Sequence, residues 1–410
     1  MGVQDRRRFA QTRSGCALLR VWDLQPRRPS LRSARFCFMA SLKVPFFRYP
    51  HVFAQHREEV LAAMLRTMER GAYILQDEVR EFEEVIARLT GAKHVVGVAN
   101  GTDGLIIALR AAGIGPGHEV ILASHTYVAT AAAVHFNGAT PVLVECGDDH
   151  LIDPQAVAAA ITPRTRALLP TQLNGRTCDM SALTALAQRH NLLLIEDAAQ
   201  ALGARYQGRC AGTFGVASMI SLYPAKLLGC MGDGGLVMTN DDEVARQVRL
   251  LRDHGRNDKG EVVTWGFNSR LDTVQAAVLL AKARHYPAEM ERRRQIARLY
   301  RQGLANLEDL RLPPGPDNDG DRYDVYQNYE IDAGRRDALR AHLQEHGVGT
   351  LVQWGGKPVH RLSGLGFENV RLPRTERMFE RCFLLPMNTS LTDDEVGYIC
   401  QTTREFYGCH

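Results

Sequence analysis

The stretch Ala217-Ser-Met-Ile-Ser-Leu-Tyr-Pro-Ala-Lys226-Leu-Leu-Gly-Cys-Met-Gly-Asp-Gly-Gly235-Leu-Val-Met-Thr239 decides the fold. Its two ends, 217–222 and 235–239, are short apolar runs of the kind that form buried strands. Between them lies a turn rich in glycine and other small residues, and this turn carries Lys226. Upstream, a third apolar run begins at 192 and ends in Glu196-Asp197-Ala-Ala-Gln200. The pattern predicts buried strands, one of which ends in an aspartate and one of which leads into a lysine turn.

A lysine and an aspartate placed in this way suit pyridoxal phosphate. The lysine amine forms a Schiff base with the cofactor aldehyde. The aspartate pairs with the pyridinium nitrogen and keeps it protonated, so that the ring can accept electrons from a carbanion. Taken alone, Lys226 would be read as a solvated surface lysine. The segments around it favour the cofactor reading, with Asp197 and Lys226 as the catalytic pair.

Outward from the lysine turn, short apolar runs alternate with amphipathic segments. Seven strands are predicted at 94–100, 120–124, 140–145, 166–170, 192–197, 217–222 and 235–239. Helices are predicted between the earlier strands at 102–112, 128–136, 154–160 and 181–190, and elsewhere at 51–91, 243–254 and 273–285. This alternation indicates an α/β fold with a mostly parallel sheet covered on both faces.

The C-terminal part has a different pattern. A long charged helix is predicted from 288 to about 307, and a loop rich in proline, glycine and aspartate follows at 313–321. Strands at 325–331 and 348–352 then flank a helix at 335–346. We therefore expect a large domain over 41–287 and a smaller α+β domain over 288–410.

Residues 1–40 differ in composition from the rest. They hold nine arginines and two aspartates, which leaves a net charge of −3 for the remainder of the chain. We expect a disordered leader or an upstream extension of a reading frame whose start is Met39, with an organelle transit peptide as the alternative. The remainder shows no basic footprint for nucleic acid and no apolar run of about 18 residues that would span a membrane.

The 410-residue chain is otherwise ordinary globular material, 45% hydrophobic and 23% charged. Its nine cysteines are scattered, without a C-x-x-C pair or the His/Cys spacing of a metal site. Isolated thiols fit a reducing compartment. We expect a cytoplasmic protein without a metal.

Three further segments carry candidate binding groups. Thr102 and Asp103 open a predicted helix after a strand, where backbone N–H groups can hold a phosphate; a plain helix cap is the alternative. Tyr127 follows the strand at 120–124, and its ring either stacks on a pyridine ring or packs in the core. Asn268 and Arg270 precede a predicted helix, where a turn residue and a surface ion pair are the alternatives. Open α/β sheets bind ligands at the carboxyl ends of their strands.

Five segments in this order resemble the sugar aminotransferases of the DegT/DnrJ/StrS family, which serve amino-sugar synthesis for antibiotics and surface polysaccharides. They are Gly-Thr-Asp-Gly-Leu at 101–105, Thr-Tyr-Val-Ala-Thr at 126–130, Glu-Asp-Ala-Ala-Gln at 196–200, the lysine turn at 221–235, and Gly-Phe-Asn-Ser-Arg-Leu-Asp at 266–272. The resemblance covers about 43–405. It implies the aspartate aminotransferase type of fold (fold type I), with a mainly parallel seven-stranded sheet and a small C-terminal domain.

The resemblance also implies roles for individual residues. The cofactor-binding set is Thr102, Asp103 and Ser221 at the phosphate, Tyr127 on the ring, Asp197 at the ring nitrogen, Gln200 at the ring oxygen, Lys226 as the covalent anchor, and Asn268 reaching the phosphate of the partner subunit in a homodimer with shared sites. Two segments depart from the family pattern: 170–175, with Gln172 where many relatives have histidine, and 352–360. These two segments supply three substrate candidates, Asn174, Trp354 and His360. Arg270 is the fourth.

The reaction implied is transfer of an amino group from an amino acid, by resemblance L-glutamate, to a keto group on a nucleotide-linked sugar, with pyridoxamine phosphate as the intermediate. A sugar dehydratase on the same fold would replace the lysine by histidine, so Lys226 disfavours it. A non-catalytic regulator on the same fold is a second alternative, disfavoured by retention of the whole cofactor set. A nicotinamide enzyme is excluded because the glycines at 113–117 precede a strand rather than follow one.

Overall fold

The structure is a computed structural model that describes residues 42–317 and 320–409. These residues belong to one compact unit. The predictions made above for residues 1–40 lie outside the described residues. Within them, no helix has the length and apolar character needed to cross a bilayer.

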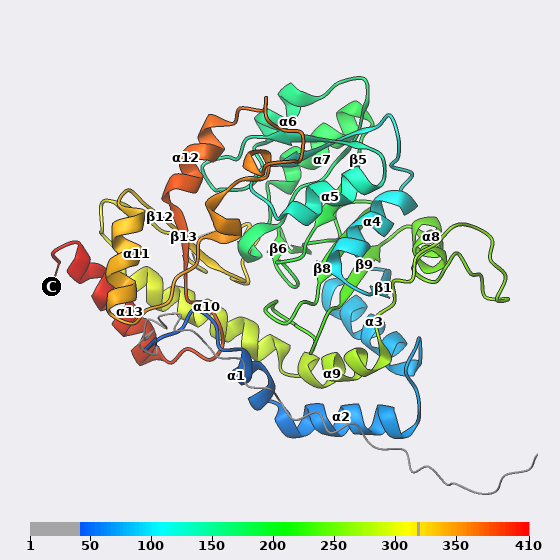
Figure 1. The fold of residues 1–410 in the computed structure, drawn as a ribbon, viewed down its shortest axis with the longest axis horizontal. Coiled ribbons are helices and arrows are strands. Elements are labelled where there is room, and N and C mark those ends of the chain that lie inside the picture. The colour runs from blue at the N-terminus through cyan, green and yellow to red at the C-terminus, as the bar shows by residue number, and fades with distance from the viewer. Residues whose placement is uncertain (1–41, 318–319, 410) are drawn as a thin grey trace, which may run out of the picture. The chain divides into compact units, whose positions relative to one another are not determined.

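A seven-stranded sheet forms the centre of the fold (Figure 1). Its strands are β1 (His94–Val98), β2 (Glu119–Ala123), β3 (Thr140–Val144), β4 (Thr165–Leu168), β5 (Leu193–Asp197), β8 (Ala217–Ser221) and β9 (Gly235–Thr239), in the order β1-β9-β8-β5-β4-β2-β3. The pairs from β3 through β8 are parallel, and β9 is antiparallel to both of its neighbours. All seven predicted strands and the mostly parallel sheet are confirmed.

Helices cover both faces of this sheet, because successive strand residues point to opposite sides. In β2, Val120 packs into one core cluster and Ile121 into another. The first face is covered by α4 (Gly101–Ala111), α5 (Val128–Phe136) and α8 (Asp242–Arg252). The second is covered by α3 (Asp77–Thr90), α6 (Pro154–Ala160), α7 (Met180–His190) and α9 (Thr273–Ala283). The predicted helices at these positions are confirmed.

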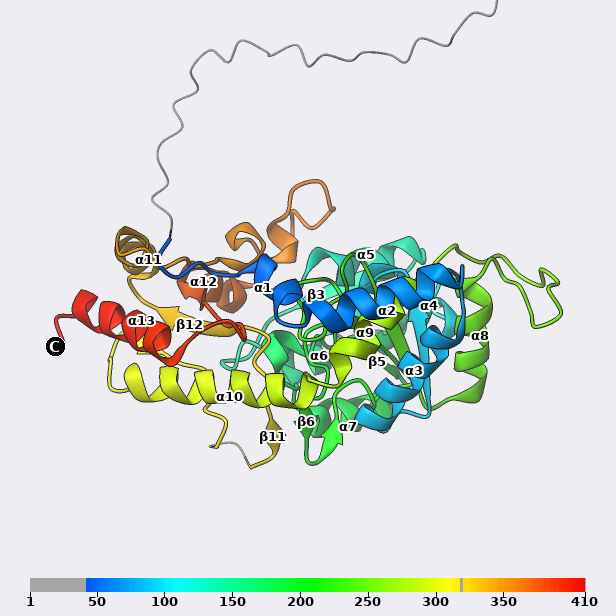
Figure 2. The same ribbon diagram turned by 90° about the horizontal axis from the view of Figure 1, so that it is seen from below.

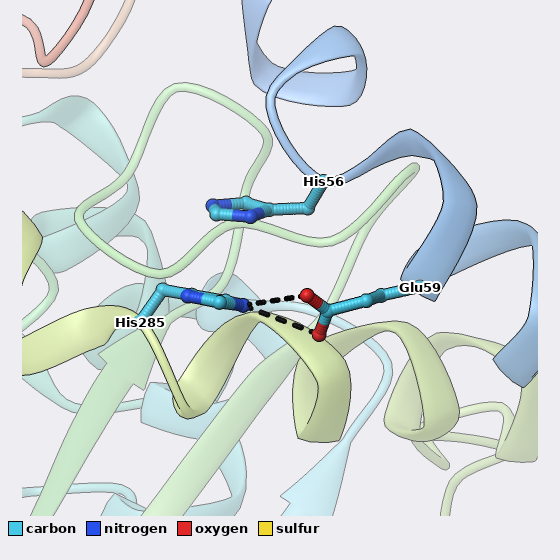
Figure 3. Close-up of side chains that lie close together, drawn as sticks. All are labelled: His56, Glu59 and His285. Atoms are coloured by element: carbon cyan, nitrogen blue, oxygen red, sulfur yellow. Dashed lines mark hydrogen bonds and ion pairs between the residues drawn. The ribbon is translucent and has the colours of Figure 1, made fainter.

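The helical stretch expected at 51–91 is divided into α1 (Tyr49–Ala54), α2 (Arg57–Glu69) and α3. The break after α2 falls at Gly71, whose φ of +65° takes the chain out of the helical region. Two stacked histidines connect α2 to the junction between α9 and α10 (Tyr286–Gly303) (Figure 3). The His56 and His285 rings lie 4.1 Å apart at 14°. His285 Nε2 lies 3.1 Å from Glu59 Oε1, and His56 Nε2 lies 3.0 Å from Glu289 Oε1.

Because the lone pairs of stacked rings lie in parallel planes, this cluster suits two histidine–carboxylate hydrogen bonds better than one shared metal ion. It connects the N-terminal helices to the long helix that leads to the C-terminal part, and Figure 2 shows α2 running beside α9.

The C-terminal part has its own antiparallel sheet, β10-β12-β13. Its elements are α10 (Tyr286–Gly303), β10 (Leu310–Arg311), β12 (Tyr329–Ala333), α11 (Arg336–Glu345), α12 (Pro373–Arg381), β13 (Cys382–Leu385) and α13 (Asp393–Phe406). A third small sheet joins β6 (Arg205–Tyr206), β7 (Arg209–Cys210) and β11 (Arg322–Tyr323).

Two strand predictions in this part are wrong. The strand expected at 325–331 begins only at Tyr329, because the Val325 N–H donates instead to the Gly175 carbonyl of the large sheet's loop region. The strand expected at 348–352 makes two isolated bridges, from Val348 to Val44 and from Leu351 to Leu384, and no continuous ladder. The predicted helix at 335–346 is confirmed as α11.

The C-terminal part also contributes to the cores around the large sheet. Met378 and Phe379 pack with residues of β2, β4 and α7, and Val359 and Leu372 pack with residues on the opposite face. The segment that contains Trp354 is thereby held against the carboxyl edge of the sheet. The division expected near residue 287 remains a prediction.

Candidate active site

A cavity of about 600 Å³ lies at the carboxyl ends of the parallel strands. Seven of the predicted site residues line it: Thr102, Tyr127, Asp197, Gln200, Ser221, Lys226 and Trp354. Among the residues described, its lining does not include the other five: Asp103, Asn174, Asn268, Arg270 and His360. The cavity lies where an open α/β sheet binds its ligand.

One wall of the cavity is the N-terminus of α4. Asn100 caps this helix by accepting a hydrogen bond from the Asp103 N–H at 2.8 Å. The N–H groups of Gly101 and Thr102, the two residues before Asp103, have no partner within the helix. A Cβ on Gly101 would lie 3.0 Å from Met219 Sδ and 3.2 Å from Ser221 Cβ. Glycine thus lets the helix start come close to β8, and the result is an anion site beside the Ser221 hydroxyl.

Asp197 is the buried acid of the cavity, 4% exposed at the end of β5. Its carboxylate accepts hydrogen bonds from the Thr130 hydroxyl at 2.7 Å and from the Ala199 N–H at 3.1 Å. Burial raises the pKa of Asp197, and these hydrogen bonds and the charge of Lys226 offset only part of that effect. A buried carboxylate of this kind is stabilised by a cation in the cavity, such as a protonated ring nitrogen.

Lys226 faces Asp197 from the turn after β8. The turn is closed by a 2.8 Å hydrogen bond from the Lys226 N–H to the Tyr223 carbonyl, and the Gln327 side chain holds the Ala225 carbonyl at 2.9 Å. Burial lowers the pKa of the Lys226 amine to about 8, although the charge of Asp197 acts in the opposite direction. Burial therefore has the larger effect on the pKa of both Asp197 and Lys226. As a result, part of the Lys226 amine is neutral and nucleophilic near neutral pH.

Three threonines behind Asp197 were not singled out from the sequence. Thr171 lies 2.8 Å from Thr126, which lies 2.7 Å from Thr130. Each hydroxyl has one proton to donate. Because Thr130 gives its proton to Asp197, Thr126 must donate to Thr130 and Thr171 to Thr126. The chain of hydroxyls therefore points toward Asp197 and favours its ionised form. Thr126 and Thr130 belong to the 126–130 motif, but nothing in the sequence shows that they and Thr171 form a hydrogen-bonded chain.

Four predicted residues lie in other environments. The His360 ring is fully buried and bonds Ser124 Oγ at 2.7 Å and Glu376 at 2.9 Å, so both of its nitrogens are engaged away from the cavity. Arg270 donates to Asp253 at 2.7 Å. Asn268 is exposed, on a segment that bridges to the loop after α8. Asp103 contributes its backbone to the helix cap.

Two polar residues of the segment 170–175, Gln172 and Asn174, lie in different environments. Gln172 is buried and donates to Glu196 at 2.7 Å, so it supports β5 rather than lining the cavity. Asn174 donates its backbone N–H to Gln200 Oε1 at 2.8 Å, and its side chain lines a second cavity of about 450 Å³. Asn174 therefore acts on the main cavity through Gln200.

The residues present fit pyridoxal phosphate. The helix start and Ser221 form an anion seat, Lys226 supplies an amine of lowered pKa, and Asp197 supplies a buried acid for a ring nitrogen. The exposed ring of Tyr127 lines the same cavity. This fold with this site defines a pyridoxal phosphate-dependent aminotransferase of the aspartate aminotransferase type.

Comparisons with known proteins agree. A model of the DegT/DnrJ/EryC1/StrS aminotransferase family matches residues 54–404. A pleiotropic regulatory protein of Geobacillus stearothermophilus is 40% identical over 371 residues, 89% of this chain and 99% of that protein. A dTDP-3-amino-3,4,6-trideoxy-alpha-D-glucose transaminase of Streptomyces venezuelae is 43% identical over 369 residues, 89% of this chain and 96% of that protein. The crystal structure of S. venezuelae DesV in complex with a ketimine intermediate shares 42% identity and a TM-score of 0.84, over 88% of this chain and 98% of that one. The chain belongs to the DegT/DnrJ/EryC1/StrS aminotransferase family.

Proposed function

We propose that the protein transfers an amino group from an amino acid, L-glutamate by preference, to a keto group of a nucleotide-linked sugar in amino-sugar biosynthesis. The observation that carries the proposal is the pair formed by Lys226, with its lowered pKa, and the buried Asp197 opposite the N-terminus of α4, in a cavity of about 600 Å³. The Trp354 ring lines the same cavity and offers a flat apolar face for a sugar ring, while the Tyr127 ring stacks on the cofactor. The name of the S. venezuelae relative supports the sugar class.

When bound, pyridoxal phosphate supplies an electron sink for a carbanion. The N–H groups of Gly101 and Thr102 and the Ser221 hydroxyl would hold its phosphate. Asp197 would hold the ring nitrogen protonated, supported by the threonine hydroxyls. Lys226 would anchor the cofactor, and its free amine would accept and return the proton at the substrate carbon. A pKa of about 8 suits a group that must both accept and return a proton near neutral pH.

Two alternatives on the same fold are less well supported. A sugar dehydratase of this family would carry histidine in place of Lys226. A regulator without turnover would have no need for a lysine of lowered pKa opposite a buried acid, an arrangement that costs folding free energy and is typical of active sites.

The experiment loads the protein with pyridoxamine phosphate and offers it dTDP- and UDP-linked ketosugars that differ in the position of the keto group. We expect one of them to be converted to an aminosugar, detected by mass spectrometry, with return of the yellow cofactor absorbance. Borohydride reduction of the resting protein should leave the cofactor on Lys226, the sole lysine between Lys93 and Lys259. Lys226→Ala is the control. A protein that transaminates amino acids but no ketosugar would retain the cofactor assignment and overturn the sugar.

We propose further that the active unit is a homodimer in which Asn268 binds the phosphate in the partner's site. Asn268 is exposed and does not line its own chain's cavity, which supports a role across an interface. The test mixes Lys226→Ala with Asn268→Ala and allows subunit exchange, because a shared site would leave one intact site in each heterodimer. Partial recovery of activity is expected. Absence of recovery, with heterodimers shown by mass spectrometry, would assign Asn268 to its own chain.

The proposal includes a cytoplasmic location and a division into two domains near residue 287. The seven described cysteines are free thiols, which supports a reducing compartment. A separate hydrophobic cluster around Tyr300, Tyr329 and Leu343 supports the C-terminal domain.

A further inference from the structure

The two segments in which this chain departs from its family pattern contact one another. Gln353, from the 352–360 segment, donates its side-chain amide to Asn174 Oδ1 at 3.0 Å, and Asn174 belongs to the 170–175 segment. Asn328, just before β12, donates to the same Asn174 oxygen at 2.8 Å. Three amide side chains from distant parts of the sequence thus meet behind Gln200, between the main cavity and the second cavity of about 450 Å³.

The orientation of these amides is fixed from one end by Glu330. This carboxylate is buried between His125 and His150, and His150 Nδ1 lies 2.6 Å from Glu330 Oε1. Burial alone would raise the pKa of Glu330, but the two histidines outweigh it and hold the pKa well below its usual range. An ionised carboxylate can only accept hydrogen bonds. Gln353 therefore turns its nitrogen toward Glu330, at 3.0 Å, and the same nitrogen reaches Asn174.

The other end is fixed by the backbone. The Asn174 N–H, which can only donate, points at Gln200 Oε1 at 2.8 Å. The Asn328 nitrogen lies 3.4 Å from the same Gln200 oxygen. Because both neighbours are donors, the Gln200 oxygen is held away from the main cavity. The Gln200 nitrogen, with its two N–H groups, is the end left to face the cavity.

We propose that Asn328 and Gln353 are positioning residues that, with Glu330 as the fixed end, hold the Gln200 amide so that its nitrogen donates to the ring oxygen of the cofactor. The inference rests on the proposed function, which places that oxygen beside Gln200. It adds that a hydrogen-bond chain which starts in the C-terminal part of the protein acts together with the Asn174 N–H to set the direction of the Gln200 amide. A reversed amide would turn an oxygen toward the negatively charged ring oxygen.

The test replaces Asn328 by aspartate, which has the same shape but only acceptor oxygens above its own pKa. Asp at this position would face the oxygens of Asn174 and Gln200 and would act against the Asn174 N–H, which still donates to Gln200 Oε1, so the reversed Gln200 amide would become more populated. The ring oxygen carries the most negative charge when the Lys226–cofactor imine nitrogen is deprotonated. A hydrogen-bond donor to this oxygen stabilises that deprotonated form and therefore lowers the pKa of the imine nitrogen. Asn328→Asp should therefore raise this pKa by about one unit, read from cofactor absorbance against pH. Cofactor affinity should fall about tenfold, read by titrating the apoprotein.

Asn328→Ala removes one donor without adding an acceptor and should shift the absorbance titration less. Gln353→Leu, which frees Asn174 to turn, should shift it in the same direction. The matched control is Asn137→Asp, because Asn137 is a buried amide that donates to the Ile106 and Ala133 carbonyls away from both cavities. It should lower stability and leave the titration unchanged.

Gln200→Ala sets the reference for complete loss of the donor. If it raises the imine pKa and Asn328→Asp matches it, the inference is supported. If it raises the pKa and Asn328→Asp does not, the positioning chain is wrong while the proposed function stands. If Gln200→Ala itself leaves the titration unchanged, the cofactor role of Gln200 is wrong and the inference fails with it.

Discussion

The pKa of Lys226 can be measured in the apoprotein, before any cofactor chemistry. With a pKa of about 8, about one Lys226 amine in ten is neutral at pH 7. For a lysine at the reference value of 10.5, about one in three thousand is neutral at the same pH. Burial in this cavity thus makes the reactive form about 300 times more abundant.

The assay labels the apoprotein briefly with a limiting acylating reagent over a range of pH and quantifies the Lys226 peptide by mass spectrometry. Burial slows access of the reagent, but it does not move the pH at which labelling is half-maximal, so the midpoint reports the pKa. We expect a midpoint near 8 in the native apoprotein and a midpoint close to that of a free lysine derivative in urea.

The Asp197→Asn variant tests the cause. Because the charge of Asp197 raises the pKa of Lys226 against the effect of burial, its removal should lower the midpoint below 8. A native midpoint equal to that of the free lysine derivative would refute the assigned burial. An unchanged or higher midpoint in Asp197→Asn would refute the coupling between the two residues.

Three further outcomes are expected. In turnover, Asp197→Asn should keep cofactor affinity within severalfold and lower the rate on the order of 10²-fold or more, measured by steady-state kinetics; near-normal turnover would contradict its assignment. Gly235→Ala would place a Cβ 2.6 Å from the backbone at the start of α4 and should weaken cofactor binding, whereas Gly397→Ala, with open space around it, should not. Burial alone would lower the pKa of His125, but Glu330 and Cys146 outweigh it and raise the pKa from 6.5 to about 10, while the pKa of Glu330 is held below its usual 4.5. Their pairing should therefore stabilise the fold fully between about pH 4.5 and 6.5 and progressively less up to about pH 10; urea unfolding across this range should show the decline, and His125→Asn should remove it.

The large sheet was predictable because its signal is local. Each strand from β1 to β9 in the seven-stranded sheet is a short apolar run bounded by turn residues, and each crossover helix has its own cap or amphipathic pattern. The C-terminal part lacks such signals. The apolar residues of 325–331 look like one strand, but Val325 pairs with the Gly175 loop and only the later residues join β12. A competing long-range partner decides the boundary there.

The same difference separates the parts of the site. Lys226, Asp197 and Thr102 stand in motifs whose neighbours reveal their role. Thr130 also stands in a motif, at 126–130, but the motif does not reveal its role, which is a 2.7 Å contact with a residue 67 positions away. His360 stands in a segment where the sequence suggested substrate contact, yet its two ring nitrogens are taken by Ser124 and Glu376. Sequence spacing cannot reveal that a polar side chain is already satisfied.

The contact between Gln353 and Asn174 joins the 352–360 segment to the 170–175 segment. The Asn174 oxygen also accepts from Asn328, and the Gln353 nitrogen also donates to Glu330, so each group has a second partner in the same network. Together the two residues satisfy each other, and the ionised Glu330 sets the direction of donation. The physical unit at this point of the site is therefore the hydrogen-bonded set rather than any one of its residues, and changes that keep the donors and acceptors in balance should be tolerated better than changes at single positions.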